Sequence, residues 1–214
     1  MISQDLIPKV QAYVKEYMSH YDGSHDYTHI ERVTQLAGHI YEHEKTRNPT
    51  LDPAVITIAA YLHDVGDRKY LRAGEDGATL VRDVLESLGA PPELAQRVQA
   101  ICLGVSYSSE IKDCAKVAAL VQQMPELAVV QDADRLDALG AVGIGRTFLF
   151  SGAKGRVMQD SVDHFDEKLL LLAGMMKTET GRQMAIERTQ RLAMFKQWWM
   201  EETGMSGTGQ KVTI

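Results

Sequence analysis

The chain has 214 residues, 44% hydrophobic and 24% charged, a composition typical of a folded globular protein and not of a disordered or collagen-like one. This length favours one domain, which can bury enough apolar surface to fold without disulfides. With 23 Lys and Arg against 29 Asp and Glu, the net charge is −6, which argues against a general nucleic-acid-binding protein but allows a local cationic pocket.

The sequence shows no sign of a membrane or secretory segment. It has no run of roughly 20 apolar residues, which a membrane-spanning helix needs. The first residues include neither a basic nor an apolar segment, so we expect no signal peptide. Cys102 and Cys114 do not form a C-x-x-C pair, and two isolated thiols predict a reducing, cytoplasmic location.

Apolar residues recur at helical spacing along most of the chain. Asp52 followed by Pro53 is typical of a helix start, and Gly89 followed by Pro91 and Pro92 marks the end of one helix and the start of another. In chain order, the pattern predicts helices over about 28–44, 53–63, 80–88, 92–102, 115–123, 127–149, 165–172 and 184–199.

Few segments alternate apolar and polar residues, so we predict no sheet. The expected fold class is all-α, a single-domain orthogonal helical bundle of about eight to ten helices. We expect this domain to cover residues 1–203. Residues 204–214 are rich in Gly, Ser and Thr and are predicted to form a flexible C-terminal tail.

The dipeptide His63-Asp64 is the first candidate for chemistry. Adjacent side chains in the middle of a helix diverge, but near a helix end, where Gly66 releases the backbone, both can reach one ion. An imidazole nitrogen and a carboxylate oxygen suit Mn²⁺, Fe²⁺, Co²⁺ or Mg²⁺. His29 and one of Asp132 or Asp134 could complete the site, leaving positions for water. Taken singly, each histidine is more often a hydrogen-bonded or surface residue than a metal ligand.

The order of these residues resembles the H…HD…D motif of the HD-domain superfamily of metal-dependent phosphohydrolases. Longer matches resemble its YpgQ- and YedJ-like bacterial subgroup and extend over about residues 17–201. They are S-H-D-x-x-H-x-x-R-V, H-D-V-G-D-R-K-Y, D-A-D-R-L-D-A-L-G-A-V-G-I-G-R-T-F and T-E-T-G-R-x-x-A-x-x-R. The resemblance implies a nucleotide pyrophosphohydrolase that cleaves (deoxy)nucleoside triphosphates to a monophosphate and pyrophosphate.

The resemblance also implies a site for one divalent metal ion, with Mn²⁺ expected first and Mg²⁺, Co²⁺, Fe²⁺ or Ni²⁺ as alternatives. Its implied ligands are His29, His63, Asp64 and Asp134. Asp134 is preferred to Asp132 because A-D-R-L matches the segment that holds the last ligand in relatives, and Asp132 is then expected to support a ligand histidine or a helix face. Asp67 matches an acidic catalytic residue that is Glu in some relatives.

Five basic residues are predicted to bind the substrate's phosphates: Arg32, Lys69, Arg72, Lys168 and Arg188. Arg32 shares a helix face with His29. The last two lie on amphipathic helices, where a cation at the rim of an apolar face is common without any ligand, so that alternative stays open. The expected partner is a small phosphorylated molecule, a nucleotide by the resemblance, and neither duplex nucleic acid nor a membrane; the oligomeric state is not predicted.

Three other functions remain open at this point. One is a phosphomonoesterase of the 5′-nucleotidase type that uses the same metal. The second is a cyclic-nucleotide phosphodiesterase, although the chain lacks the extra ligand-rich segments of a two-metal site. The third is a non-catalytic metal- or nucleotide-binding protein, against which the apparently complete ligand set and Asp67 argue.

Overall fold

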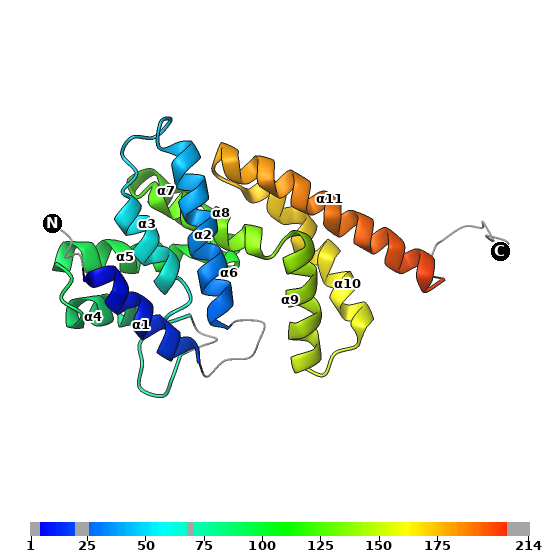
Figure 1. Cartoon of the computed structure of the whole chain (residues 1–214), viewed down its shortest axis with the longest axis horizontal. Coiled ribbons are helices and arrows are strands. Elements are labelled where there is room, and N and C mark those ends of the chain that lie inside the picture. Colours follow the sequence, from blue (N-terminus) through cyan, green and yellow to red (C-terminus); the bar gives the residue numbers. More distant parts are fainter. Residues whose placement is uncertain (1–4, 20–25, 68–70, 205–214) are drawn as a thin grey trace.

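The computed structural model describes residues 5–19, 26–67 and 71–204, and this part of the chain forms one domain of eleven α-helices and a 3-10 helix, without strands (Figure 1). The predicted all-α fold class is therefore confirmed. In chain order the elements are α1 (Leu6–Met18), α2 (Tyr27–Glu44), α3 (Pro53–Leu62), α4 (Leu80–Ser87), α5 (Pro92–Val105), α6 (Tyr107–Lys112), α7 (Cys114–Gln123), α8 (Glu126–Asp137), α9 (Gly140–Ala153), α10 (Met158–Glu167), the 3-10 helix η1 (Leu169–Met175) and α11 (Glu179–Glu202). None of the described helices is long and apolar enough to cross a membrane.

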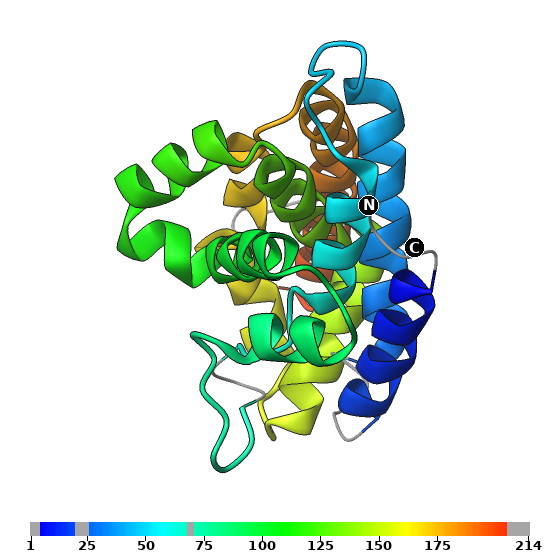
Figure 2. The same ribbon diagram turned by 90° about the vertical axis from the view of Figure 1, so that its left-hand side faces the viewer.

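Helix α8 lies at the centre of the bundle. It packs against α2, α3, α5, α7, α9 and α11, and every residue of α8 except Asp134 is buried. Figure 2 shows α4–α7 and the α1–α2 pair on opposite flanks of the molecule. Each fully buried Leu or Val on α8 contributes about 1.5–3 kcal/mol, so the position of this helix is strongly fixed.

Two of the predicted helices are wrong because each is interrupted. The segment predicted as one helix over 127–149 is two helices, and the break falls at Gly140, whose φ of +70° lies in the left-handed region. The segment predicted over 165–172 changes from α10 to the 3-10 helix η1 at Lys168. The apolar pattern continues across both breaks, because both sides of each break face the core. Helices α1 and α6 were not predicted.

Side-chain caps explain where α2 and α3 begin. The Asp26 carboxylate accepts hydrogen bonds from the backbone N–H groups of Thr28 and His29, at 3.1 and 3.3 Å. Asp52 caps α3 in the same way, with Pro53 at the first helical position, as the sequence predicts. The cap on α2 holds His29 in the first turn of that helix.

The start of α11 is anchored to α8 through Asp132. This buried carboxylate accepts hydrogen bonds from the backbone N–H groups of Lys177 and Thr178, at 2.9 and 2.7 Å, and from the Thr178 hydroxyl at 2.7 Å. Thr178 in turn caps α11 by accepting from the Gly181 N–H at 2.9 Å. A Cβ at position 181 would overlap the Asp132 carboxylate, so this close approach requires the glycine of the T-E-T-G motif.

We predict that Gly181→Ala destabilises the protein and that Gly38→Ala does not. An added methyl at 181 must displace the Asp132 carboxylate or the Thr178 hydroxyl, at a cost of about 1–3 kcal/mol. Gly38 lies exposed within α2 with no atom within 4 Å of an added Cβ, so alanine there stabilises the fold by about 0.4–1 kcal/mol. Urea unfolding of both variants checks this, and equal stability of the two would contradict the packing described for Gly181.

Candidate metal-dependent active site

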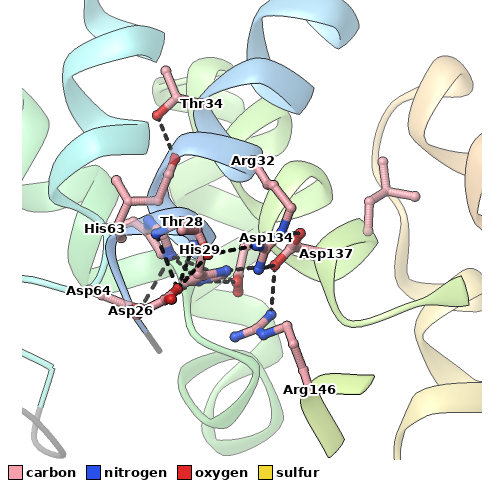
Figure 3. Close-up of polar contacts among 12 residues, drawn as sticks. Asp26, Thr28, His29, Arg32, Thr34, His63, Asp64, Asp134, Asp137 and Arg146 are labelled. Carbon is pink, nitrogen blue, oxygen red and sulfur yellow. Dashed lines mark hydrogen bonds and ion pairs between the residues drawn. The ribbon is translucent and has the colours of Figure 1, made fainter. Parts of the chain in front are cut away.

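The four predicted metal ligands converge from three parts of the fold (Figure 3). His29 comes from the first turn of α2, His63 and Asp64 follow the end of α3, and Asp134 lies on α8. The Nε2 atoms of the two histidines are 3.2 Å apart. An Asp64 oxygen lies 3.5 Å from His29 Nε2, and Asp134 Oδ1 lies 3.6 Å from His29 Nε2 and 3.7 Å from His63 Nε2.

The turn after α3 brings His63 and Asp64 to the same point. The helix ends at Leu62, and Gly66 has a φ of +82°, which favours glycine. Gly77 packs directly against this turn: a Cβ at position 77 would overlap the Gly66 carbonyl oxygen. The release of the backbone expected at Gly66 is therefore present, and it places the two adjacent side chains beside one another.

The hydrogen bonds of the two imidazoles show that the site fits a cation. His63 Nδ1 lies 2.8 Å from the Ala60 carbonyl oxygen, and His29 Nδ1 lies 2.8 Å from Asp137 Oδ2. Both partners are acceptors, so each Nδ1 carries the hydrogen of the neutral ring. Each Nε2 then presents a lone pair, and two lone pairs face each other across 3.2 Å. A divalent ion between them would remove this repulsion.

The electrostatics of His29 lead to the same conclusion. Burial disfavours the charged ring, but the Asp137 and Asp64 carboxylates stabilise its protonated form by more, so the pKa of His29 is raised above its ordinary value. The site thus attracts positive charge. His29, His63 and Asp64 present ligand atoms within 4.8 Å of one another, and Asp134 supplies a further oxygen beside both rings. Two imidazoles and two carboxylates form a set that borderline divalent ions accept.

The choice between Asp132 and Asp134 follows from the register of α8. Asp134 faces the histidines, with 28% of its side chain exposed, whereas Asp132 is buried and bonded to the segment before α11. Of the two roles expected for Asp132, the structure shows a helix-face carboxylate bonded to Lys177 and Thr178, and the carboxylate that contacts His29 is Asp137. The sequence analysis missed Asp137. Its three-residue spacing from Asp134, which places both carboxylates on one face of α8, could have indicated it.

Asp137 is a buried carboxylate held by several nitrogen donors. Besides His29, it accepts hydrogen bonds from Arg32 Nε at 2.7 Å, Arg32 Nη2 at 3.0 Å and Arg146 Nη1 at 3.0 Å. Burial alone would raise the pKa of Asp137, but the His29 and Arg32 hydrogen bonds and the charge of Arg146 hold it far below the usual range for Asp. The group is therefore an anion at any physiological pH.

A cavity of about 570 Å³ opens directly above the ligand set. All four predicted ligands and Asp67 line it, together with Tyr107 of α6 and Lys168, which lies between α10 and η1. Lys168 Nζ lies 4.9 Å from the centre of the Tyr107 ring. The cavity is large enough for a small ligand and combines a metal-ligand set with cationic and aromatic side chains.

The predicted phosphate-binding residues lie in different places. Lys168 lines the cavity, whereas Lys69 lies outside the described residues. Arg32 binds Asp137, as above. Arg72 packs on the Tyr17 ring at 4.6 Å and donates to its carbonyl oxygen at 3.2 Å. Arg188 Nη1 donates to the Leu136 carbonyl oxygen at 2.6 Å, and burial lowers the pKa of its guanidinium.

Three other basic residues line the cavity and were missed by the sequence analysis: Lys112, Arg135 and Arg146. Arg146 lies in the G-I-G-R-T-F part of the long motif, and nothing in that pattern distinguishes a cavity residue from a surface one. Lys112 comes from α6, the helix that the sequence did not predict. Only the packing of α6 and α9 around α8 brings these cations to the ligand set.

Glu110 holds the α6 wall of the cavity in place. Its buried carboxylate pairs with Arg135 on α8 and with Lys177 Nζ at 2.8 Å, and Arg135 also donates to the Met175 carbonyl oxygen at 2.9 Å. Burial opposes its ionisation, but hydrogen bonds from Lys177 and Arg135 dominate, so the pKa of Glu110 is lowered. The carboxylate therefore ties α6 to the helix that carries Asp134.

Comparison with known proteins places this geometry in a family. The model of the HD domain matches residues 26–139, which include all four predicted ligands. The chain belongs to the HD-domain family of metal-dependent hydrolases. It is 37% identical over 191 residues to the uncharacterised protein YpgQ of Bacillus subtilis, covering 87% of this chain and 88% of YpgQ.

Solved structures of HD proteins support the assignment. The crystal structure of Bacillus subtilis YpgQ in complex with ADP superposes with a TM-score of 0.75 and 33% identity, covering 92% of this chain and 95% of that one. An HD-superfamily hydrolase from Bacillus thuringiensis gives a TM-score of 0.70 and 35% identity, covering 94% and 98%. The resemblance read from the sequence is thus confirmed, and this HD protein is a hydrolase by family.

We predict that Asp64→Ala and Asp134→Ala each weaken Mn²⁺ binding by more than about 100-fold. Loss of a residue that only supports a metal ligand typically costs about 10–100-fold in affinity, and loss of a ligand should cost more. Each change removes an anionic oxygen from beside the His29 and His63 rings. Asp160→Ala, an exposed carboxylate on α10, is the control and should bind as the wild type does. Isothermal titration of the metal-free proteins measures the affinities. Wild-type affinity in Asp134→Ala would remove that residue from the ligand set.

Proposed function

We propose that this HD protein is a nucleotide pyrophosphohydrolase that cleaves (deoxy)nucleoside triphosphates to the monophosphate and pyrophosphate. The observation that carries the proposal is that the predicted metal ligands line the same cavity as Arg146, Lys112 and Lys168. Several cations in the cavity that holds the predicted ligands suit a chain of phosphates. The relative crystallised with ADP supports a nucleotide as the ligand.

The proposed ligands His29, His63, Asp64 and Asp134 would hold one divalent ion, and Mn²⁺ is the proposed native metal among the several divalent ions that a mixed imidazole and carboxylate set accepts. Such an ion supplies Lewis acidity, both to a phosphoryl oxygen and to water. The two carboxylates would balance the formal charge of the ion, so attraction for an anionic substrate would come from open positions on the ion and from the basic side chains that line the cavity.

Asp67 is the proposed catalytic base. It lies three residues beyond Asp64 and lines the same cavity as the predicted ligands. In the proposed reaction it accepts the proton of the attacking water. Attack at the α-phosphorus would release pyrophosphate as a unit, with negative charge growing on its oxygens.

The departing phosphates are assigned to Lys168, Lys112 and Arg146. These three line the cavity, although Arg146 also donates to Asp137. Arg32, Arg72 and Arg188 are not among the lining residues and are held by Asp137, Tyr17 and Leu136 respectively, so their predicted phosphate contacts remain predictions. Tyr107 offers an aromatic face to a base. Because every base can stack on such a face, we expect modest discrimination among the four bases.

Hydrolysis in ¹⁸O-labelled water tests the proposed function. Wild-type protein with Mn²⁺ should convert dGTP and the other triphosphates to a labelled monophosphate and unlabelled pyrophosphate, measured by anion-exchange chromatography and mass spectrometry. Orthophosphate released from monophosphates alone would instead identify a phosphomonoesterase. Metal-dependent nucleotide binding without turnover would identify a non-catalytic binding protein.

Asp67→Asn should lower kcat by about 10²–10⁴ while metal affinity stays near that of the wild type. The amide keeps the size of the side chain but cannot accept a proton from water at neutral pH. Asp76→Asn, an exposed residue of the same loop that does not line the cavity, is the matched control. A raised KM with unchanged kcat in Asp67→Asn would show that this residue binds substrate and does not act as the base.

A further inference from the structure

Asp137 is almost completely buried and is surrounded by hydrogen-bond donors, and nothing in the H…HD…D motif assigns it a role. It is 1% exposed and lies at the C-terminal end of α8. Its donors come from two other helices: His29 and Arg32 from α2, and Arg146 from α9 (Figure 3). One carboxylate thus joins three helices at the edge of the candidate metal site.

The two oxygens of Asp137 are used differently. Oδ1 accepts from Arg32 Nε at 2.7 Å. Oδ2 lies 2.8 Å from His29 Nδ1 and also accepts from Arg32 Nη2 and Arg146 Nη1, both at 3.0 Å. An ionised carboxylate can only accept hydrogen bonds, so the neutral His29 ring must carry its hydrogen on Nδ1. The other nitrogen, Nε2, is then available toward His63, Asp64 and Asp134.

We propose that Asp137 is a positioning residue: it fixes the tautomer and the orientation of His29 so that Nε2 is preset as a metal ligand. A second partner of this kind commonly sets both the tautomer and the basicity of a ligand histidine. The inference rests on the proposed metal site but not on the identity of the substrate.

Arg32 and Arg146 make the arrangement rigid. A buried carboxylate needs compensating charge, and the two guanidiniums supply it. Arg32 lies three residues after His29 on α2, so the same carboxylate holds two neighbouring side chains of one helix face. The His29 ring is therefore held at Nδ1 by a group that cannot itself move without breaking the Arg32 and Arg146 contacts.

A purely structural role for Asp137 would predict a different outcome from a positioning role. Asp132 provides the comparison: it is a buried aspartate on the same helix with a comparable set of hydrogen bonds, all of them to Lys177 and Thr178. Replacing either carboxylate should lower stability. Only the replacement of Asp137 should change the affinity for metal in protein that remains folded.

The experiment compares Asp137→Asn with Asp132→Asn. Asparagine has one acceptor oxygen, for which His29 and the arginines must compete, and its NH₂ group faces donors. We expect Mn²⁺ affinity, measured by titration of the folded metal-free proteins, to fall about 10–100-fold in Asp137→Asn and by less than about threefold in Asp132→Asn. Equal losses in the two variants, or wild-type affinity in Asp137→Asn, would overturn the proposal.

A second measurement does not depend on the variants folding. Proton–nitrogen correlation spectra of the metal-free wild-type protein, at a pH where His29 is neutral, report which ring nitrogen carries the hydrogen. We expect Nδ1–H for His29, and an Nε2–H ring would overturn the proposal. If the wild type bound no divalent ion at all, the proposed metal-dependent function would fail, while this spectrum would still show whether Asp137 sets the tautomer.

Discussion

The site depends on the packing of α2 against α8. Both helices carry a pair of polar residues three positions apart, His29 and Arg32 on α2 and Asp134 and Asp137 on α8, and the contact brings the pairs face to face. The burial of nearly all of α8 makes this contact hard to shift. A displacement of either helix by one residue would turn a ligand away from the histidines and would leave the Asp137 charge buried without its donors.

The whole protein and its proposed substrate both carry negative charge, so binding depends on the local arrangement of charged side chains. The net charge of the protein is −6, and the proposed substrate is strongly anionic. Two buried carboxylates at the site are paired with cations: Asp137 with Arg32 and Arg146, and Glu110 with Arg135 and Lys177. Lys112 and Lys168 add basic side chains to the cavity, which Asp64, Asp67 and Asp134 also line. A local field of this kind can attract an anion even though the whole molecule repels it.

The sequence predicted the features that depend on local chemistry. The caps at Asp52 and Pro53, the special backbone at Gly66 and the helical spacing all follow from the properties of neighbouring residues, and the structure has them. Prediction failed where distant parts meet. The helix predicted over 127–149 breaks at Gly140, whose φ is in the left-handed region. Apolar periodicity does not report this break because residues on both sides of it are buried in the core.

By itself the sequence determined the fold class, the start of α3 and the set of candidate metal ligands, because these depend on residue type and on spacing along the chain. Only the tertiary structure places Asp134 beside the histidines and Asp132 against the segment before α11, brings Asp137 to His29 and brings Arg146 to the cavity. These outcomes depend on which face of α8 meets α2 and which meets α11. That choice is made by packing of the whole bundle, which no short segment encodes.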